Sequence, residues 1–470
     1  MQISERPLTW LRRTTAALSI CALTTLAALS PQNQPDGTSP EPLSSAPAKA
    51  TVQQLPVRPS LNSRGGDLRL ARTQVQRFAM LGVTWARGAE PTRVEVQVQD
   101  ANGWSRWRRL EFHGDSASGG RPGTDPLWVR SAVGIAVRVS GPARDVRAAL
   151  IDPGADPLFA HSAYLGIPDY VSRGAWGARA PKYCDQPRTA DHLDGVIFHH
   201  TAGSNRYARS ESARIVRGIQ AYHMSGQGWC DIGYNFLVDK FGQVFEGRSG
   251  GILPQVRGAH AGNFEVNTYA MGVSMMGNLD RVRPSDAMKA ATVRLIGWRL
   301  GTNYLPALGR FPIAGHSLNR ISGHRDVRLS GISPSTATAC PGRYGYRWLR
   351  AEGGLRSRVA AYVATYSTPI RARAEAMGVA QTGRVRIGEY PSMQGTKTVF
   401  GNGRMYDAGG GAWWVTAPVL ATYLEQGEET GALGWPISDA SVGPSGTTQE
   451  FEHGTISIDP ATGVATVTPR

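Results

Sequence analysis

The length of this chain limits how it can fold. A single hydrophobic core rarely organises more than about 250–300 residues, and the sequence has 470. Hydrophobic residues make up 41% of it and charged residues 19%, as in ordinary folded proteins. We therefore expect three folded modules joined by linkers, rather than one globule or a disordered chain.

The N-terminus has the order of an export signal. Arg12 and Arg13 precede an apolar and small-residue stretch from Thr14 to Leu29. We expect residues 1–30 to be a signal peptide, read by the general or the twin-arginine route. The mature protein would then have no stable membrane span and would be secreted or held in the cell wall. Residues 31–62, rich in Pro, Ser and Gln, are predicted to be a disordered linker.

The formal charge of +15 suits a polyanionic partner without identifying it. Only five of the 51 basic residues are lysines, and no run of five or six basic residues forms a nucleic-acid-binding arm. We therefore expect no nucleic-acid partner.

The first module, residues 63–153, has the alternation of a β fold. Val94, Val96 and Val98 point to one face of a strand, and Asn102-Gly103 favours a hairpin turn after it. A small antiparallel β-sandwich is predicted, with the nearby Trp104 and Trp107 in its core rather than on a sugar-stacking surface.

The second module, residues 165–366, interleaves strands with helices. A short buried strand over 196–198, a helix over 211–222, a strand over 271–276 and a helix from 284 to 300 indicate an α/β fold. Its expected architecture is a central mixed β-sheet flanked by helices. The third module, residues 371–470, contains two copies of one weak pattern about 50 residues apart, which begin near Ile387 and Leu433.

Candidate metal ligands lie far apart in the second module. His199-His200 directly follows the strand over 196–198, and because successive strand residues point to opposite faces, only one of the two enters a given site. His199 is the preferred one. His324 and Cys340 follow downstream, and two imidazoles with one thiolate are a standard catalytic zinc set.

The alternative chemistry is a Cys–His nucleophile, for which the surroundings of Cys340 carry no local signature. Cys184, Cys230 and Cys340 would be the cysteines of the mature chain, and in an oxidising compartment two of them should pair. Tyr234, at the start of a strand, is a candidate hydrogen-bond donor to an oxyanion.

These segments together resemble the peptidoglycan recognition protein and type-2 N-acetylmuramoyl-L-alanine amidase family, over about 180 residues. The resemblance implies Zn²⁺ on His199, His324 and Cys340, Tyr234 and Thr338 as catalytic residues, and His223 and His260 along the substrate groove. It also leaves Cys184 and Cys230 as the disulfide pair. The motifs that carry it are Trp176-Gly177-Ala178-Arg179, His199-His200-Thr201, Tyr222-His223-Met224, Asp231 to Phe236, Gly258-Ala259-His260, Met271-Gly272-Val273 and His324 to Cys340.

The resemblance implies an enzyme that hydrolyses the amide between N-acetylmuramic acid and L-alanine in peptidoglycan. The alternative within the family is a recognition protein that binds peptidoglycan without cutting it. His316 lies close to His324 in the sequence, but only the latter matches the family motif. The C-terminal copies resemble LGFP repeats, so we expect the third module to bind cell-wall polymers.

Overall fold

The computed structural model describes residues 49–59, 67–113, 120–154, 161–164, 166–182, 187–333 and 338–470. The predicted signal peptide over 1–30 lies outside these residues. The described residues fall in one compact unit, Ser45–Arg470. Of the helices in the described residues, none has the length and apolar character needed to cross a bilayer.

The first module is antiparallel throughout, as predicted. Its sheet runs in the order β1-β9-β2-β8-β3-β4, with β5, β6 and β7 paired at the side, and Leu81, Val96 and Val137 are among the fully buried residues of its core. The strands are β1 (Thr51–Pro59), β2 (Leu68–Thr84), β3 (Arg93–Asp100), β4 (Gly103–Trp104), β5 (Arg108–Arg109), β6 (Phe112–His113), β7 (Gly123–Thr124), β8 (Leu127–Ser140) and β9 (Val146–Asp152).

Two expectations about this module are wrong. Residues 51–59, placed in the linker over 31–62, form strand β1, which pairs with β9 along seven residues. Most of its side chains stay partly or fully exposed, so it lacks an apolar period, and its end position in the sheet order tolerates Pro56. Trp104 and Trp107 are only half-buried and are covered by guanidinium groups rather than by the core.

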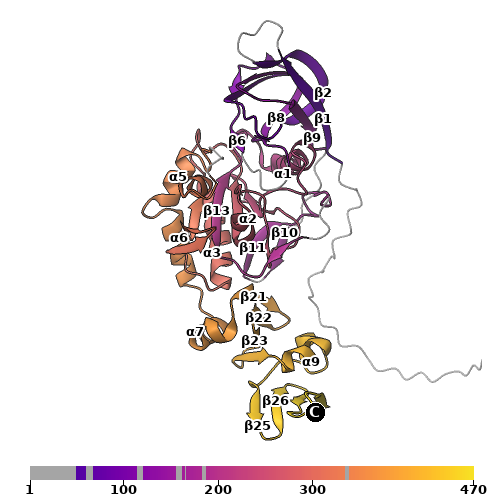
Figure 1. Cartoon of the computed structure of the whole chain (residues 1–470), viewed down its shortest axis with the longest axis vertical. Helices are drawn as coiled ribbons and strands as arrows, with labels where there is room; N and C mark the ends of the chain where they lie inside the picture. Colours follow the sequence, from indigo (N-terminus) through magenta and orange to yellow (C-terminus); the bar gives the residue numbers. More distant parts are fainter. Residues whose placement is uncertain are drawn as a thin grey trace, which may run out of the picture. The chain divides into compact units, whose positions relative to one another are not determined.

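The second module contains the predicted mixed sheet, in the order β10-β11-β15-β14-β17-β13-β20 (Figure 1). The strands are β10 (His161–Tyr164), β11 (Ile167–Val171), β12 (Thr189–Ala190), β13 (Gly195–His200), β14 (Phe236–Val238), β15 (Val244–Glu246), β16 (Gln255–Val256), β17 (Ala270–Met275), β18 (Arg310–Ile313), β19 (His316–Asn319) and β20 (Ile321–Gly323). The helices are η1 (Arg209–Glu211), α1 (Ser212–Ala221), η2 (Tyr222–Gly226), α2 (Phe264–Tyr269), α3 (Asp286–Thr302), α4 (His324–Leu329), α5 (Arg343–Arg350) and α6 (Leu355–Ala364).

Helices cover both faces of this sheet. Val196 and Phe198 of β13 pack with residues of α3 and α6, while Leu237 of β14 packs with Ile215 and Ile219 of α1 on the other face. With both faces covered, β13 is buried along its whole length, and its apolar residues Val196, Ile197 and Phe198 follow one another rather than alternate with polar ones. The helix predicted to begin at Pro284 begins at Asp286, because the Ser285 hydroxyl caps it by accepting a hydrogen bond from the Met288 amide.

Helix α1 also contacts the first module. Met80, Trp128 and Ile151 of the β module share a hydrophobic cluster with α1. The Tyr222 hydroxyl donates to the backbone carbonyl of Thr124 at 2.9 Å, and the Arg217 guanidinium donates to that of Pro153 at 3.1 Å. One face of α1 is therefore buried by its own sheet and another by the β module.

The third module repeats one arrangement twice, in which helices precede a four-stranded antiparallel sheet. The two predicted copies, which begin near Ile387 and Leu433, each continue into a hairpin, β22–β23 in the first and β26–β27 in the second. The elements are α7 (Pro369–Met377), α8 (Val379–Thr382), β21 (Val385–Ser392), β22 (Gly395–Phe400), β23 (Gly403–Asp407), β24 (Ala412–Thr416), α9 (Val419–Glu425), η3 (Glu428–Thr430), β25 (Ser441–Gly443), β26 (Gly446–Phe451), β27 (Gly454–Ile458) and β28 (Ala465–Pro469).

Two predicted boundaries shift. The expected start at residue 371 falls inside α7, whose Ile370 and Ala374 pack with Met405 and Trp414 of the following sheet, so the repeat module begins at the helix cap Thr368. The expected start of the α/β module at residue 165 omits β10, which pairs with β11.

Candidate metal centre

The strand register brings His199 and His324 together. Strand β20 pairs parallel with β13, with Phe198 opposite Gly323. The next residue on each side is a histidine, His199 on β13 and His324 at the first position of α4. Their ring centroids lie 4.7 Å apart, so the parallel pairing itself places two imidazoles at the end of the sheet.

Cys340 joins them from the loop before α5. The Arg325 amide donates to its carbonyl at 3.0 Å, which holds this loop against the start of α4. Its Sγ lies 3.5 Å from Nδ1 of His199. One ligand atom from each of His199, His324 and Cys340 lies within 4.8 Å of the others, and the three side chains are at most 2% exposed.

This donor set fits zinc. Two imidazole nitrogens and one sulfur leave a fourth tetrahedral position open, and Zn–N and Zn–S bonds of about 2.0 and 2.3 Å put N and S about 3.5 Å apart. The measured Nδ1–Sγ separation of 3.5 Å matches this value. The residues present therefore suit a catalytic rather than a four-ligand structural zinc site.

Burial raises the pKa of the Cys340 thiol well above its ordinary value. Desolvation penalises the thiolate, and the hydrogen bond from the His200 amide to Sγ at 3.4 Å only partly offsets that penalty. Without a cation beside it, this cysteine is a neutral thiol at physiological pH and a poor nucleophile.

Tyr234 and His223 lie beside the three ligand residues. The Tyr234 ring centroid is 5.4 Å from that of His199 and 5.9 Å from that of His223. His223 lies in η2, a π-helical turn of the kind often found at functional sites. Its Nδ1 accepts a hydrogen bond from the Gly233 amide at 3.1 Å, so the neutral ring carries its proton on Nε2, and the ring packs 4.5 Å from Trp229.

His260 lies beside His199, and its expected place along the substrate groove stays a prediction. It is completely buried, and its Nδ1 lies 3.1 Å from Nε2 of His199. Asn267 holds its backbone amide at 2.8 Å. A Cβ on Gly258 or Gly272 would lie within 2.4 Å of Cδ2 of His260, so these glycines make room for the ring behind His199.

The remaining predicted site residues are placed as follows. The Thr338 hydroxyl accepts a hydrogen bond from the Cys340 amide at 3.0 Å, so its own hydrogen is available to a further acceptor. His316 is exposed on β19 and lies outside the ligand group. Cys230 is disulfide-bonded, but Cys184 lies outside the described residues, so their pairing stays a prediction.

Sequence reasoning missed a contact made by the β module. Glu111, between β5 and β6, places Oε2 3.5 Å from Nε2 of the buried His200, and Asn278 donates to its other oxygen at 2.9 Å. No motif or spacing connects Glu111 with residues 89 positions away, so only the folded chain brings it to the end of β13.

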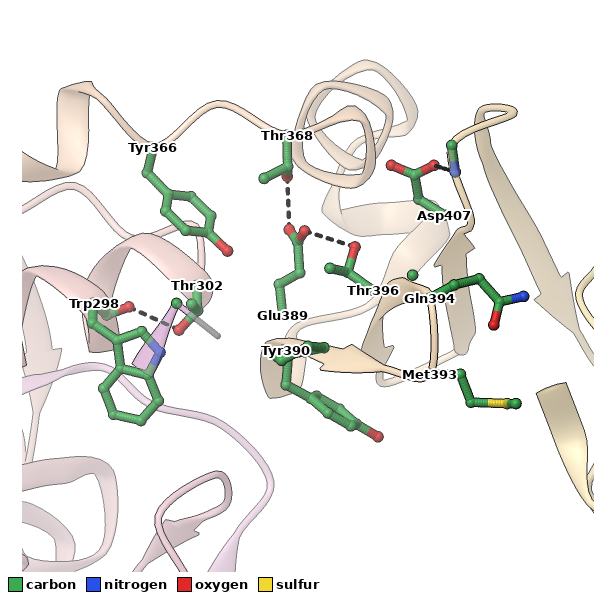
Figure 2. A pocket seen from close by; sticks show the side chains of 14 residues that line it. Trp298, Thr302, Tyr366, Thr368, Glu389, Tyr390, Met393, Gln394, Thr396 and Asp407 are labelled. Carbon is green, nitrogen blue, oxygen red and sulfur yellow. Dashed lines mark hydrogen bonds between the residues drawn. The ribbon is translucent and has the colours of Figure 1, made fainter. Parts of the chain in front are cut away.

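Cavities in the described residues also lie outside the ligand group, among them two that are lined by residues of more than one module. One, of about 680 Å³, is lined by residues of both modules, including Arg109, Glu111 and Arg281. The other, of about 450 Å³, lies between α3 and the first repeat. Figure 2 shows Glu389 at its centre, bound by the hydroxyls of Thr368 and Thr396. Neither cavity contains a residue of the His/His/Cys set.

This fold and site define a class of α/β proteins. In this class, two imidazoles at the ends of parallel strands and a thiol from a neighbouring loop form a candidate metal-binding group. The N-acetylmuramoyl-L-alanine amidase family matches residues 189–343. An Rv3811 N-terminal galactose-binding domain-like family matches residues 34–158, and the LGFP repeat matches residues 433–470.

The chain is also similar to individual peptidoglycan recognition proteins. Peptidoglycan recognition protein 1 of Bos indicus is 39% identical over 165 residues, which are 35% of this chain and 77% of that protein. Peptidoglycan-recognition protein SC1a/b of Drosophila simulans is 35% identical over 192 residues, 40% of this chain and 89% of that protein. The crystal structure of Drosophila peptidoglycan recognition protein SD aligns at 27% identity and a TM-score of 0.31, over 38% of this chain and 92% of that one.

The chain belongs to the peptidoglycan recognition protein and N-acetylmuramoyl-L-alanine amidase family, with an N-terminal galactose-binding-like domain and a C-terminal LGFP repeat.

Proposed function

We propose that this protein is a zinc-dependent N-acetylmuramoyl-L-alanine amidase that separates the stem peptide of peptidoglycan from the sugar strand. The observation that carries the proposal is the position of Cys340, whose Sγ completes a three-ligand group with His199 and His324. The buried thiol 3.5 Å from an imidazole nitrogen supports metal-dependent hydrolysis over recognition alone.

His199, His324 and Cys340 would hold the ion. Bound zinc would polarise the scissile carbonyl as a Lewis acid and lower the pKa of a water molecule so that it attacks near neutral pH. The raised pKa of the Cys340 thiol favours this chemistry over a Cys–His nucleophile, because only a neighbouring cation would make the sulfur anionic.

The remaining residues of the site would orient the substrate and stabilise the negative charge that develops on it. The Tyr234 hydroxyl, on a ring whose centroid lies 5.4 Å from that of His199, would donate a hydrogen bond to the oxyanion that develops on the amide carbonyl. The Thr338 hydroxyl, fixed by the Cys340 amide, would provide a second and uncharged donor. The Nε2 proton of His223, fixed there by the Gly233 amide, would donate to a substrate oxygen rather than act as a base.

The likeness to peptidoglycan recognition proteins supports peptidoglycan as the partner of the α/β module. The LGFP match supports attachment of the repeat module to cell-wall polymers. We infer that the protein acts outside the cytoplasm, in the cell wall or in the medium.

The test compares the wild-type protein with Cys340→Ser on purified peptidoglycan, with zinc measured by mass spectrometry and products by liquid chromatography. We expect the wild type to release peptides with a free N-terminal alanine, and the variant to lose both zinc and release. Undiminished release by Cys340→Ser would exclude the zinc mechanism. Binding without release by the zinc-loaded wild type would assign the protein to recognition instead.

A further inference from the structure

One carboxylate of the β module, that of Glu111, lies at the end of strand β13. Glu111 lies in a segment that belongs to the antiparallel β module, yet its side chain faces His200 of the α/β module. The Asn278 amide group holds the other carboxylate oxygen at 2.9 Å. The carboxylate is thus fixed from one side and presented to the imidazole from the other.

His200 requires an acceptor at this place. Its Nδ1 accepts a hydrogen bond from the Leu279 amide at 3.0 Å, so the neutral ring must carry its proton on Nε2. The residue is completely buried, and Nε2 has no hydrogen-bond partner of ordinary geometry among the residues that the structure describes. Oε2 of Glu111, at 3.5 Å, is an acceptor within reach.

His200 in turn holds Cys340. The His200 amide donates to Sγ at 3.4 Å, and Sγ also lies 3.8 Å from the His200 carbonyl oxygen. The position of this one residue therefore sets the sulfur relative to His199, the neighbouring position on β13. A displacement of the His200 ring would be transmitted through one residue of backbone to two members of the ligand group.

We propose that Glu111 is a positioning residue for the metal centre. Its carboxylate accepts a hydrogen bond from Nε2 of His200 and thereby fixes the backbone that orients His199 and Cys340. The inference rests on the proposed zinc site, and it makes the β module part of that site rather than an independent attachment. The geometry requires an acceptor oxygen toward His200 at position 111. It does not require a negative charge there.

The variants follow from that requirement. Glu111→Ala removes both acceptor oxygens, whereas Glu111→Gln keeps one of them and can accept from only one of the two donors, His200 or Asn278. Glu211→Ala is the matched control, because Glu211 forms the ion pair with Arg130 across the same two modules at 3.0 Å and touches none of the ligand residues. All three are made in the full chain.

Zinc affinity is the first measurement, by competition with a chromophoric chelator. We expect Glu111→Ala to bind zinc about 10- to 100-fold more weakly, as for loss of other partners that orient metal ligands, with Glu111→Gln between Glu111→Ala and the wild type, and Glu211→Ala within a few-fold of the wild type. Equal affinity in Glu111→Ala and the wild type would overturn the proposal. Loss of affinity in Glu211→Ala as well would reduce Glu111 to a general contact between modules.

A second measurement needs no metal. In the zinc-free protein, the Nε2 proton of His200 should give a slowly exchanging imidazole signal in ¹H–¹⁵N spectra, present in the wild type and absent in Glu111→Ala. If that signal survives in Glu111→Ala, another group accepts the proton and the inference fails. A wild-type protein that binds no zinc would instead refute the proposed function, so the two failures are distinguishable.

Discussion

Nε2 of His199 lies 3.1 Å from Nδ1 of His260, which is 61 residues further along the chain. Because Nδ1 of His199 faces Cys340, the two ring nitrogens of His199 have separate tasks. If Nδ1 binds the proposed zinc ion, Nε2 carries the proton and donates a hydrogen bond to Nδ1 of His260. His260 would then orient the imidazole of a metal ligand.

His260→Ala should therefore weaken zinc binding by about 10- to 100-fold without unfolding the protein. The alanine leaves Nε2 of His199 with no oriented acceptor at this point, so the imidazole loses its fixed rotation. Zinc affinity is measured by chelator competition and the fold by circular dichroism. His316→Ala, an exposed histidine on β19, is the control and should bind zinc normally; an unaltered affinity in His260→Ala would contradict the assignment.

Tyr234→Phe should lower the rate of peptide release by about 100-fold or more while zinc content stays the same. The substitution removes only the hydroxyl, and the ring still packs beside His199 and His223. Rates are measured on a soluble muropeptide by chromatography. Tyr207→Phe removes the hydroxyl of another buried tyrosine, which binds the Met276 carbonyl, and should not change the rate. Parallel loss of zinc in Tyr234→Phe would mean that the tyrosine supports the site rather than the reaction.

Removal of residues 368–470 should weaken retention on whole cell walls and spare cleavage of soluble muropeptide. The cut precedes α7, which packs with the first repeat sheet, so no half-helix remains. Sedimentation with insoluble walls measures retention. Loss of both properties to the same degree would make the repeats part of the catalytic unit.

The first repeat should lose stability in acid. Burial acts to raise the pKa of Glu428, but the hydrogen bond from Lys397 and the charges of Lys397 and Arg404 outweigh it, and the pKa lies below its ordinary 4.5. A lowered folded-state pKa means that the stabilisation is complete above pH 4.5 and is lost as pH falls through the lower value.

Lys397 limits the stability of the same region at high pH. Burial acts to lower its pKa, but hydrogen bonds to Glu429 and Glu428 raise it above its ordinary 10.5, so its contribution is present below pH 10.5 and disappears at higher pH. Hydrogen exchange of the β22 and β23 amides should accelerate at both extremes. Glu428→Gln should reduce the acceleration of hydrogen exchange at acid pH. If the acceleration at acid pH is unchanged in this variant, Glu428 is not its cause.

Local pattern was enough to predict much of the site. The run of apolar residues before His199 predicted a buried strand, and alternation along that strand separates His199 from His200 by face. The same pattern predicted helix α3 to within two residues of its start, because Ser285 is a strong cap. These features depend on neighbours in the sequence, which local periodicity reports directly.

Other features depend on partners that no local pattern reveals. Strand β1 has little apolar character, and its place comes from pairing with β9. The position of His260 beside His199 depends on two glycines, one of them on β17, that open a space which only the folded sheet defines. Glu111 belongs to another module, so its contact with His200 arises from the packing of two domains and from no spacing within either.

The double covering of helix α1 has a practical consequence for any study of the α/β module in isolation. A fragment that starts at β10 would leave the face that meets Met80, Trp128 and Ile151 open to water, and exposed apolar surface of that kind promotes self-association. Expression of such a fragment should yield aggregates, and any fusion or truncation made for biotechnology should keep the chain from Thr51 onward intact.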